Sequence, residues 1–522
     1  MRTTLRRLQV LLPLALFLAS LFLYSRTLAP TITWQHDGYD GGDLITAAYT
    51  GGIPHPTGYP TYMLLGRCFL LLPVGDIAHR MNLLSAVSAA LAVMLLYSAA
   101  TFLLQSRAYA RLASVCAALF LATSRVFWSQ ALIAEVYALN CLFFTAALCL
   151  LLRFQAYPGQ GSGDPRSRAG AFELAVLAAL TYGLSLGNHL TMVLTAPLWL
   201  WTGASTVRRR TLTPRQWVCV LGSFILGLSV YVYLPLRAGR PPLLNWGDPS
   251  TLKGFLWVVG GGPYRHFVMG LPPALWGQRL MAWAALLRQQ FGLAGVVLGL
   301  VGVWKQLERP SVQILSLVAT FVLYSLYAIG YNTTDSYVYL LPAYVLSALW
   351  IAQGAHYVLS SLAGSQRRWS KPLATMSCLA LLALPLVSLR TNLPAVDSSH
   401  DYTAYDYGTQ VFDYVPNRSI VISASDAHTF TLWYFAQVVR AEKALAIIDR
   451  DLLGYDWYAR GLLQSHAWLN LGSTPQGNPA TVEALLEANR DKHAIYLTDA
   501  DPNLMSRFDF EQHGALYRLR TP

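Results

Sequence analysis

Residues 8–28 read LQVLLPLALFLASLFLYSRTL, an apolar run that follows Arg2, Arg6 and Arg7. At about 1.5 Å per residue, a helix of this length crosses a hydrocarbon layer of roughly 30 Å. No small-residue cleavage site of the A-x-A kind follows the run, so we expect a retained membrane helix rather than a secretory signal peptide. The stretch therefore predicts a membrane protein.

The chain repeats this pattern as far as residue 389. Ten more apolar runs lie near residues 83–104, 112–126, 136–154, 171–187, 190–203, 216–236, 289–304, 311–330, 338–359 and 373–389. Of the 522 residues, 54% are hydrophobic and 12% are charged, against roughly 25% charged in soluble proteins. The sequence thus excludes a soluble protein and predicts an α-helical polytopic membrane protein with about eleven transmembrane helices.

The charges are unevenly divided along the chain. Residues 1–389 have a balance of +17, whereas residues 390–522 have a balance of −5. The arginine-rich connectors all fall on the side of the N-terminus: Arg107 and Arg111, Arg153 with Arg166 and Arg168, Arg208 to Arg210 with Arg215, Lys305 with Arg309, and Arg367 and Arg368 with Lys371. The positive-inside tendency predicts that this side is cytoplasmic. It also explains the basic total of the chain, so we expect no nucleic acid partner.

Two units are predicted. Residues 1–389 form the membrane module, which includes a first outer loop at 29–82 and another at 237–288. Residues 390–522 contain short buried-strand runs at 419–423, 444–449 and 494–498, with helical patterns between them at 429–440 and 481–490. This alternation predicts a small soluble α/β domain on the extracytoplasmic face. Compact loops favour a bacterial inner membrane, for which the endoplasmic reticulum is the eukaryotic equivalent.

The first outer loop carries the densest set of carboxylates, at Asp37, Asp40 and Asp43. If a helix begins after Asp40, then Asp40 and Asp43 lie on one face of it. One of them then suits a general base that accepts the proton of an attacking hydroxyl. The same spacing is typical of a helix cap, with Asp40 as the N-cap residue, and both interpretations stay open.

Several motifs resemble a known family. The stretches are DGGDLITAAY at 40–49 with GIPHPTGYPTY at 52–62, RMNLLS at 80–85, FWSQA at 127–131, EVYALN at 135–140, GNHLT at 187–191, LPLR at 234–237, NWGDP at 245–249, YNTTD at 331–335, LPAY at 341–344 and IIDRDLL at 447–453. They resemble transmembrane protein O-mannosyltransferases, a family of the GT-C superfamily that includes the animal enzyme acting on plexin-type receptors and many bacterial relatives. The family more often has Asp-Ser-Gly-Glu where this chain has Asp-Gly-Gly-Asp, so the resemblance leaves open which aspartate acts.

The resemblance implies a GT-C fold, an acidic catalytic residue in the first outer loop, and a polyprenyl-phosphate sugar donor. Breaking the bond to such a donor leaves charge on the phosphate, which arginine stabilises well. Arg80, Arg125, Arg237, Arg240 and Arg265 are predicted on the outer side. Arg237 is the preferred phosphate ligand. His55, His189, Glu135 and Asp335 complete the candidate substrate-binding set, and each of these residues also has a purely structural interpretation.

The predicted function is transfer of a hexose from a polyprenyl-phosphate donor to a hydroxyl acceptor. The resemblance favours mannose and protein Ser/Thr, with lipid or glycan acceptors as alternatives, and a single inverting displacement with Asp40 or Asp43 as base. A divalent ion has possible oxygen ligands in the first loop, but no cofactor is expected to be required. The alternatives are a transporter or flippase of a lipid-linked substrate and a non-catalytic membrane receptor.

Overall fold

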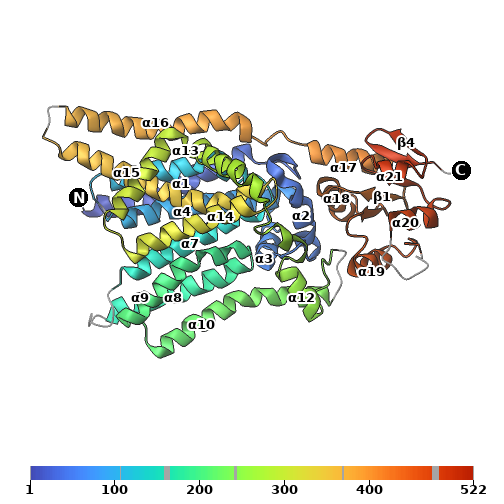
Figure 1. Ribbon diagram of the computed structural model, residues 1–522, viewed down its shortest axis with the longest axis horizontal. Coiled ribbons are helices and arrows are strands. Elements are labelled where there is room, and N and C mark those ends of the chain that lie inside the picture. The colour runs from blue at the N-terminus through green and yellow to red at the C-terminus, as the bar shows by residue number, and fades with distance from the viewer. Residues whose placement is uncertain are drawn as a thin grey trace.

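The computed structural model describes residues 2–105, 107–157, 165–239, 244–366, 369–472 and 481–520, with side chains from residue 10 onward. Arg240, Arg367 and Arg368, named above, lie outside these residues. The described residues are mainly helical up to Val396, and a small α/β domain follows at one end of the helix bundle (Figure 1). We call the end of the bundle that lies next to this domain its domain end.

The helices of the bundle are α1 (Arg2–Thr27), α2 (Gly41–Thr50), α3 (Pro60–Phe69), α4 (Ile77–Leu103), α5 (Ala110–Ala122), α6 (Arg125–Ser129), α7 (Val136–Gln155), α8 (Pro165–Leu186), α9 (Ala196–Arg209), α10 (Pro214–Leu228), α11 (Tyr233–Ala238), α12 (Leu252–Val259), α13 (Trp276–Leu307), α14 (Val312–Gly330), α15 (Leu341–Gly364) and α16 (Ser370–Val396). Short 3-10 turns are η1 (Gln35–Asp40), η2 (Leu190–Thr195), η3 (Ser229–Val232), η4 (Gly262–Phe267), η5 (Pro273–Leu275) and η6 (Ser336–Leu340).

In the described part of the chain, ten helical segments are long and apolar enough to cross a membrane, and α5 is a shorter apolar helix. The predicted polytopic membrane protein is thus confirmed. Helix α13 begins at Trp276, well before the apolar run at 289–304. Polar side chains inside its first half have partners at the domain end: Arg279 donates to Ser336 Oγ, and Gln290 Oε1 accepts from the backbone N–H of Val126. These contacts let a less apolar segment remain helical.

The C-terminal domain is built around a five-stranded sheet in the order β2-β1-β3-β5-β4. Its elements are α17 (Thr403–Tyr414), β1 (Ile420–Ser423), α18 (Asp426–Tyr434), the π-helical turn η7 (Phe435–Val439), β2 (Ala446–Asp449), α19 (Asp456–Ser465), α20 (Val482–Asn489), β3 (Ile495–Leu497), α21 (Pro502–Met505), β4 (Phe510–His513) and β5 (Leu516–Leu519). The predicted strands are β1, β2 and β3, which pair in parallel. The antiparallel hairpin of β4 and β5 was not predicted.

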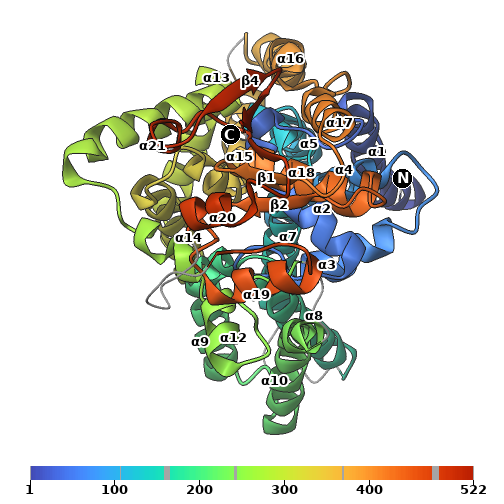
Figure 2. The same cartoon turned by 90° about the vertical axis from the view of Figure 1, so that its right-hand side faces the viewer.

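The domain and the first loop share one hydrophobic core, which includes Leu44 and Ile45 of α2 together with Phe430 and Trp433 of α18. Figure 2 looks onto the domain, with α18 lying over α2. The two helices approach so closely at Gly42 that a Cβ there would lie 2.3 Å from the carbonyl oxygen of Phe430. Glycine is therefore the residue that this contact requires, and the domain is packed onto the loop rather than tethered to it.

Candidate active site

Asp40 lies where the turn η1 meets helix α2, at the domain end of the bundle. It precedes the helix as its N-cap residue, but its side chain makes no capping hydrogen bond. The carboxylate is 38% exposed. The Asp40 side chain therefore does not cap α2, and its carboxylate oxygens are available to bind another group.

Asp43, one helical turn further along, is completely buried and has three partners. Its Oδ2 accepts hydrogen bonds from the backbone N–H of His55 and from His55 Nδ1, both at 2.8 Å. Its Oδ1 accepts from Trp246 Nε1 at 3.1 Å. Because both oxygens are engaged, Asp43 holds two distant segments, at 55 and 246, against α2.

His55 connects the two aspartates. While Nδ1 bonds Asp43, Nε2 lies 3.6 Å from Asp40 Oδ2 and 3.1 Å from the hydroxyl of Tyr59. Burial alone lowers the pKa of an imidazole, but the negative charge of Asp40 and the bond to Asp43 outweigh it and raise the pKa of His55 to about 9. At neutral pH the ring is therefore an imidazolium beside the Asp40 carboxylate.

Further carboxylates surround Asp40. The pKa of Asp40 is raised, first because protein atoms crowd it and then by the charge of Asp43, although His55 opposes the shift. Burial followed by the charge of Asp40 also raises the pKa of Glu135, which immediately precedes α7. The charge of Asp335, which precedes η6, also raises the pKa of both Asp40 and Glu135. Within the described residues, no three His, Cys, Asp or Glu side chains converge as a metal site requires.

A cavity of about 140 Å³ adjoins this cluster. Its lining is Pro56, Thr57, Tyr59, His189, Leu190, Thr191, Gly260, Gly261, Tyr264, Arg265, Val268, Tyr327, Tyr331 and Tyr339. The hydroxyl of Tyr59 links the cavity to His55, and the charge of Asp40 acts on Tyr264 and Tyr331. The cavity thus combines phenol groups, an imidazole and one guanidinium, and Tyr59 connects it to the histidine beside Asp40.

His189 is neutral in this cavity and has a defined tautomer. Burial, followed by the charge of His55, lowers its pKa to about 4. Its Nδ1 accepts from the backbone N–H of Thr191 at 3.2 Å, so the ring proton lies on Nε2. Arg265 is exposed, and its Nε donates to the carbonyl of Gly260 at 2.9 Å. The two side chains supply an N–H donor and a positive charge to the lining of the cavity.

The other predicted phosphate ligands lie elsewhere. Arg237 donates to the carbonyls of Thr50 and Gly51, at the end of α2, at 3.3 and 2.5 Å. Arg80 donates to the carbonyls of Leu70, Val74 and Gly75 in the loop before α4. Arg125 is the first residue of α6 and is exposed. None of these three arginines lines the cavity beside Tyr59 and His189.

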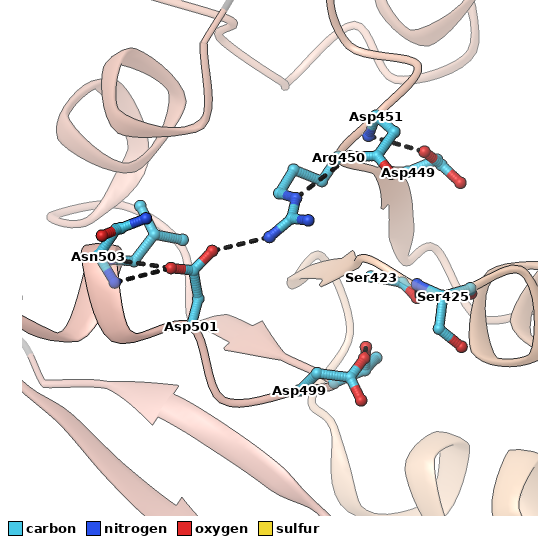
Figure 3. Close-up of polar contacts among 10 residues, drawn as sticks. Ser423, Ser425, Asp449, Arg450, Asp451, Asp499, Asp501 and Asn503 are labelled. Atoms are coloured by element: carbon cyan, nitrogen blue, oxygen red, sulfur yellow. Dashed lines mark hydrogen bonds and ion pairs between the residues drawn. The ribbon is translucent and has the colours of Figure 1, made fainter. Parts of the chain in front are cut away.

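The carboxyl ends of the parallel strands meet the site through Asp426, the first residue of α18. Crowding by protein atoms and then the charge of Asp40 raise its pKa to about 6. Beyond it, the motif at 447–453 makes contacts within the domain: Asp449 accepts from the backbone N–H of Asp451, and Arg450 reaches Asp501 at 2.8 Å (Figure 3). This motif therefore connects the carboxyl end of β2 to the turn before α21.

Sequence reasoning missed two residues that complete the site, Trp246 and Asp426. The motif at 245–249 was noted only for its resemblance to the family. Its backbone pairs with the first loop, because Trp246 N–H donates to Ile53 O and Ile53 N–H donates to Leu244 O. The sequence did offer one signal: Trp246 lies between an asparagine and a glycine, in an outer loop predicted to be on the same side of the membrane as Asp43.

Comparison with known proteins bears on the fold. Residues 40–213 match the family model "Protein O-mannosyl-transferase TMEM260 N-terminal domain". The chain is 25% identical over 438 residues to the protein O-mannosyl-transferase TMEM260 of Mus musculus, covering 81% of this chain and 60% of that protein. The Dictyostelium discoideum protein of the same name is 21% identical over 493 residues, covering 85% and 57%. The chain thus spans less than two thirds of the length of these relatives.

Two solved structures superpose along most of the chain. ArnT from Cupriavidus metallidurans, bound to undecaprenyl phosphate, gives a TM-score of 0.56 at 12% identity over 99% of this chain and 98% of that one. The Archaeoglobus fulgidus oligosaccharyltransferase tethered to an acceptor peptide gives 0.54 at 13% identity over 95% and 70%. The chain has the GT-C fold. The predicted resemblance is confirmed, and the GT-C architecture has its bundle in 2–396 and its added domain in 397–520.

Proposed function

We propose that this GT-C protein transfers a hexose, mannose by its resemblance to the O-mannosyl-transferases, from a polyprenyl-phosphate donor to a protein Ser/Thr hydroxyl. The observation that carries the proposal is the division of labour between two aspartates. Asp43 is buried and fully bonded, whereas Asp40 is 38% exposed beside an imidazolium and a cavity with a cationic wall. Asp40 is therefore assigned as the general base, with Asp43 and His55 as positioning residues.

The proposed reaction is a single displacement at the anomeric carbon of the donor. The acceptor hydroxyl gives its proton to Asp40, and its oxygen attacks the anomeric carbon from the side opposite the phosphate. The bond between that carbon and the phosphate oxygen breaks, and its electron pair leaves with the polyprenyl phosphate, so the anomeric centre inverts. Arg265 balances the charge that develops on the phosphate, and His189 Nε2–H donates to one of its oxygens.

Arg80 and Arg237 support the loops that frame the site, because their N–H groups donate hydrogen bonds to backbone carbonyls. Asp335 acts on Asp40 by charge, Asp40 acts likewise on Glu135, and both Glu135 and Asp335 would line the approach of the acceptor. No step is assigned to a metal ion, so transfer should withstand chelation with EDTA. The domain end of the bundle is proposed to lie outside the cytoplasm, as the positions of the basic connectors favour.

Asp40→Asn tests the assignment. Loss of a general base lowers the rate about 10²- to 10⁴-fold, and we expect a fall in kcat of this order with unchanged thermal unfolding. The assay uses purified protein with radiolabelled polyprenyl-phosphate mannose or, separately, glucose, and with peptides or lysate membranes as acceptors. Asp406→Asn, which alters an exposed aspartate on α17, is the matched control. Full transfer by the Asp40→Asn protein would contradict the proposed base.

A further inference from the structure

The turn η1, directly before helix α2, has an unusual backbone. His36 and Asp37 both have left-handed dihedral angles, with φ 60° and ψ 32° at His36 and φ 60° and ψ 30° at Asp37. Among the described residues, they are the one adjacent pair of non-glycine residues with positive φ. The Cβ atom is crowded in this conformation, although histidine and aspartate tolerate it better than most residues. Such strain persists only where the surrounding structure holds it.

Contacts from three separate parts of the chain hold these two residues. The hydroxyl of Tyr337, in η6, donates to Asp37 Oδ2 at 2.6 Å. The Nε2–H of His36 donates to the carbonyl of Val396, at the end of α16, at 3.0 Å. Gln130 Nε2, just after α6, donates to the carbonyl of His36 at 3.1 Å. The strained turn is therefore fixed by partners that lie between 94 and 360 positions away along the chain.

Asp40, at the end of this turn, has the backbone of a helical residue rather than that of a helix cap. Its φ of −73° and ψ of −13° lie in the right-handed helical region, so η1 continues into α2 without an extended residue between them. A capping residue normally has an extended backbone, from which its side chain reaches the free N–H groups of the first helical turn. From its helical backbone, Asp40 makes no such bond.

Two other aspartates of the chain show what Asp40 would do with an extended backbone. Asp76 precedes α4 with φ −85° and ψ −177°, and its side chain accepts from the backbone N–H of His79. Asp501 precedes α21 with φ −114° and ψ 105°, and its side chain accepts from two backbone N–H groups of that helix. The residue type is the same in all three places, so the backbone conformation separates the capping aspartates from Asp40.

We infer that His36, Asp37 and Tyr337 are positioning residues for Asp40. The left-handed pair, held by Tyr337, brings the chain into α2 in helical form and leaves the Asp40 carboxylate uncapped, with Oδ2 3.6 Å from His55 Nε2. In a relaxed turn, Asp40 would adopt an extended backbone and cap α2, so its oxygens would no longer be free to accept a proton. The inference rests on the proposed function for the role of Asp40 as base, but the effect of the turn on the carboxylate is independent of catalysis.

Two substitutions of Asp37 test the turn. Asparagine tolerates the left-handed region and still accepts from Tyr337, whereas valine is β-branched and has no acceptor. We expect Asp37→Val to lower kcat for sugar transfer about 10-fold, the factor by which the left-handed backbone is disfavoured. KM for the polyprenyl-phosphate donor should stay unchanged, because Asp37 does not line the cavity that contains His189. Asp37→Asn should retain most of kcat.

Tyr337→Phe removes only the hydrogen bond to the turn, and should lower kcat about 5-fold. Tyr402→Phe, at an exposed tyrosine before α17, is its matched control. For the backbone, the control is Arg418→Val. Arg418 is exposed, has φ 58° and lies just before β1. Valine there meets the same left-handed backbone, so it should lower the unfolding temperature and leave kcat unchanged.

A double-mutant cycle distinguishes positioning from a loss of folded protein. If Asp37 acts through Asp40, then Asp37→Val should cause no further loss in the residual transfer of the Asp40→Asn protein. A structure of the Asp37→Val protein should show the Asp40 carboxylate accepting from a backbone N–H of the first turn of α2. Equal kcat in the Val and Asn variants, a further loss of the same size in the cycle, or an unchanged Asp40 in that structure overturns the inference.

Failure of the proposed function would give a different result. Full transfer by the Asp40→Asn protein would reject Asp40 as the base, and the kinetic comparisons would then have no bearing on the turn. The structure of the Asp37→Val protein would still decide the inference, because Asp40 either caps α2 in it or keeps its free carboxylate.

Discussion

At the scale of single residues, two carboxylates with the same chemistry differ because of what surrounds them. Asp43 has no exposed surface and binds His55 and Trp246, whereas Asp40 keeps an open face. The sequence predicted both aspartates but not this difference. The partners that fix it lie 12 and 203 positions away from Asp43 along the chain, and local spacing carries no information about contacts over that separation.

The pH profile of transfer depends on the same pair. Activity should rise as Asp40 ionises and fall as His55 loses its proton near pH 9. The imidazolium favours the charged form of Asp40, so removing it with His55→Gln raises the pKa of Asp40. We therefore expect the acid limb of kcat/KM against pH to move to higher pH and the basic limb near pH 9 to disappear.

His400→Gln, which changes an exposed histidine of the segment before α17, should leave both limbs in place. The measurement is the initial rate of sugar transfer over a pH series, with protein integrity checked at each end of the series. An acid limb that stays put or moves to lower pH in His55→Gln would show that His55 does not act on the base.

At the scale of elements, the contact between α2 and α18 connects the bundle to the domain. The three parallel strands were predicted because each is a short apolar run. The β4–β5 hairpin was not, because Phe510–His513 reads as one aromatic residue followed by polar ones and is only partly buried. The α2–α18 contact was also beyond prediction, since a glycine pair at the start of a helix looks the same in the sequence whether or not another helix lies against it.

Gly42→Ala tests this contact. The added Cβ would meet the Phe430 carbonyl at 2.3 Å, so the helices must separate. Overpacking of this kind costs about 1–3 kcal/mol, and we expect a lower unfolding temperature together with reduced transfer. Gly203→Ala in α9 is the control, because a Cβ there meets nothing within 4 Å and should be neutral or slightly stabilising. Equal behaviour of the two variants would mean that the helices are not held in close contact.

At the scale of the whole molecule, basic and acidic groups separate along the long axis. The N-terminus lies at the end of the bundle opposite the domain (Figure 1), while the acidic domain packs on α2, which directly follows Asp40, at the other end. This charge division was readable from the sequence because it requires only apolar runs and the residues between them. The contact between bundle and domain could not be predicted in this way, because it depends on how side chains of two distant parts of the chain pack together.

The division predicts the orientation of the protein in the membrane. Alkaline phosphatase fused after the last residue should be active in a bacterial host, and green fluorescent protein at the same position should not fluoresce, because the domain end is proposed to lie outside the cytoplasm. Fusions of the same reporters after Arg210, between α9 and α10, should give the opposite result. Identical reporter patterns at the two positions would reject the proposed topology.

The packing of α18 over α2 also bears on how the protein is made. Asp40 leaves the ribosome nearly 400 residues before Asp426 and Phe430, which belong to the helix that packs over α2. Until then, Asp40 of the nascent chain is exposed, because Trp246 and the domain have not yet packed around the site. We therefore expect the proposed transfer only from chains synthesised beyond α18, and a product truncated before α18 should not consume a lipid-linked sugar donor.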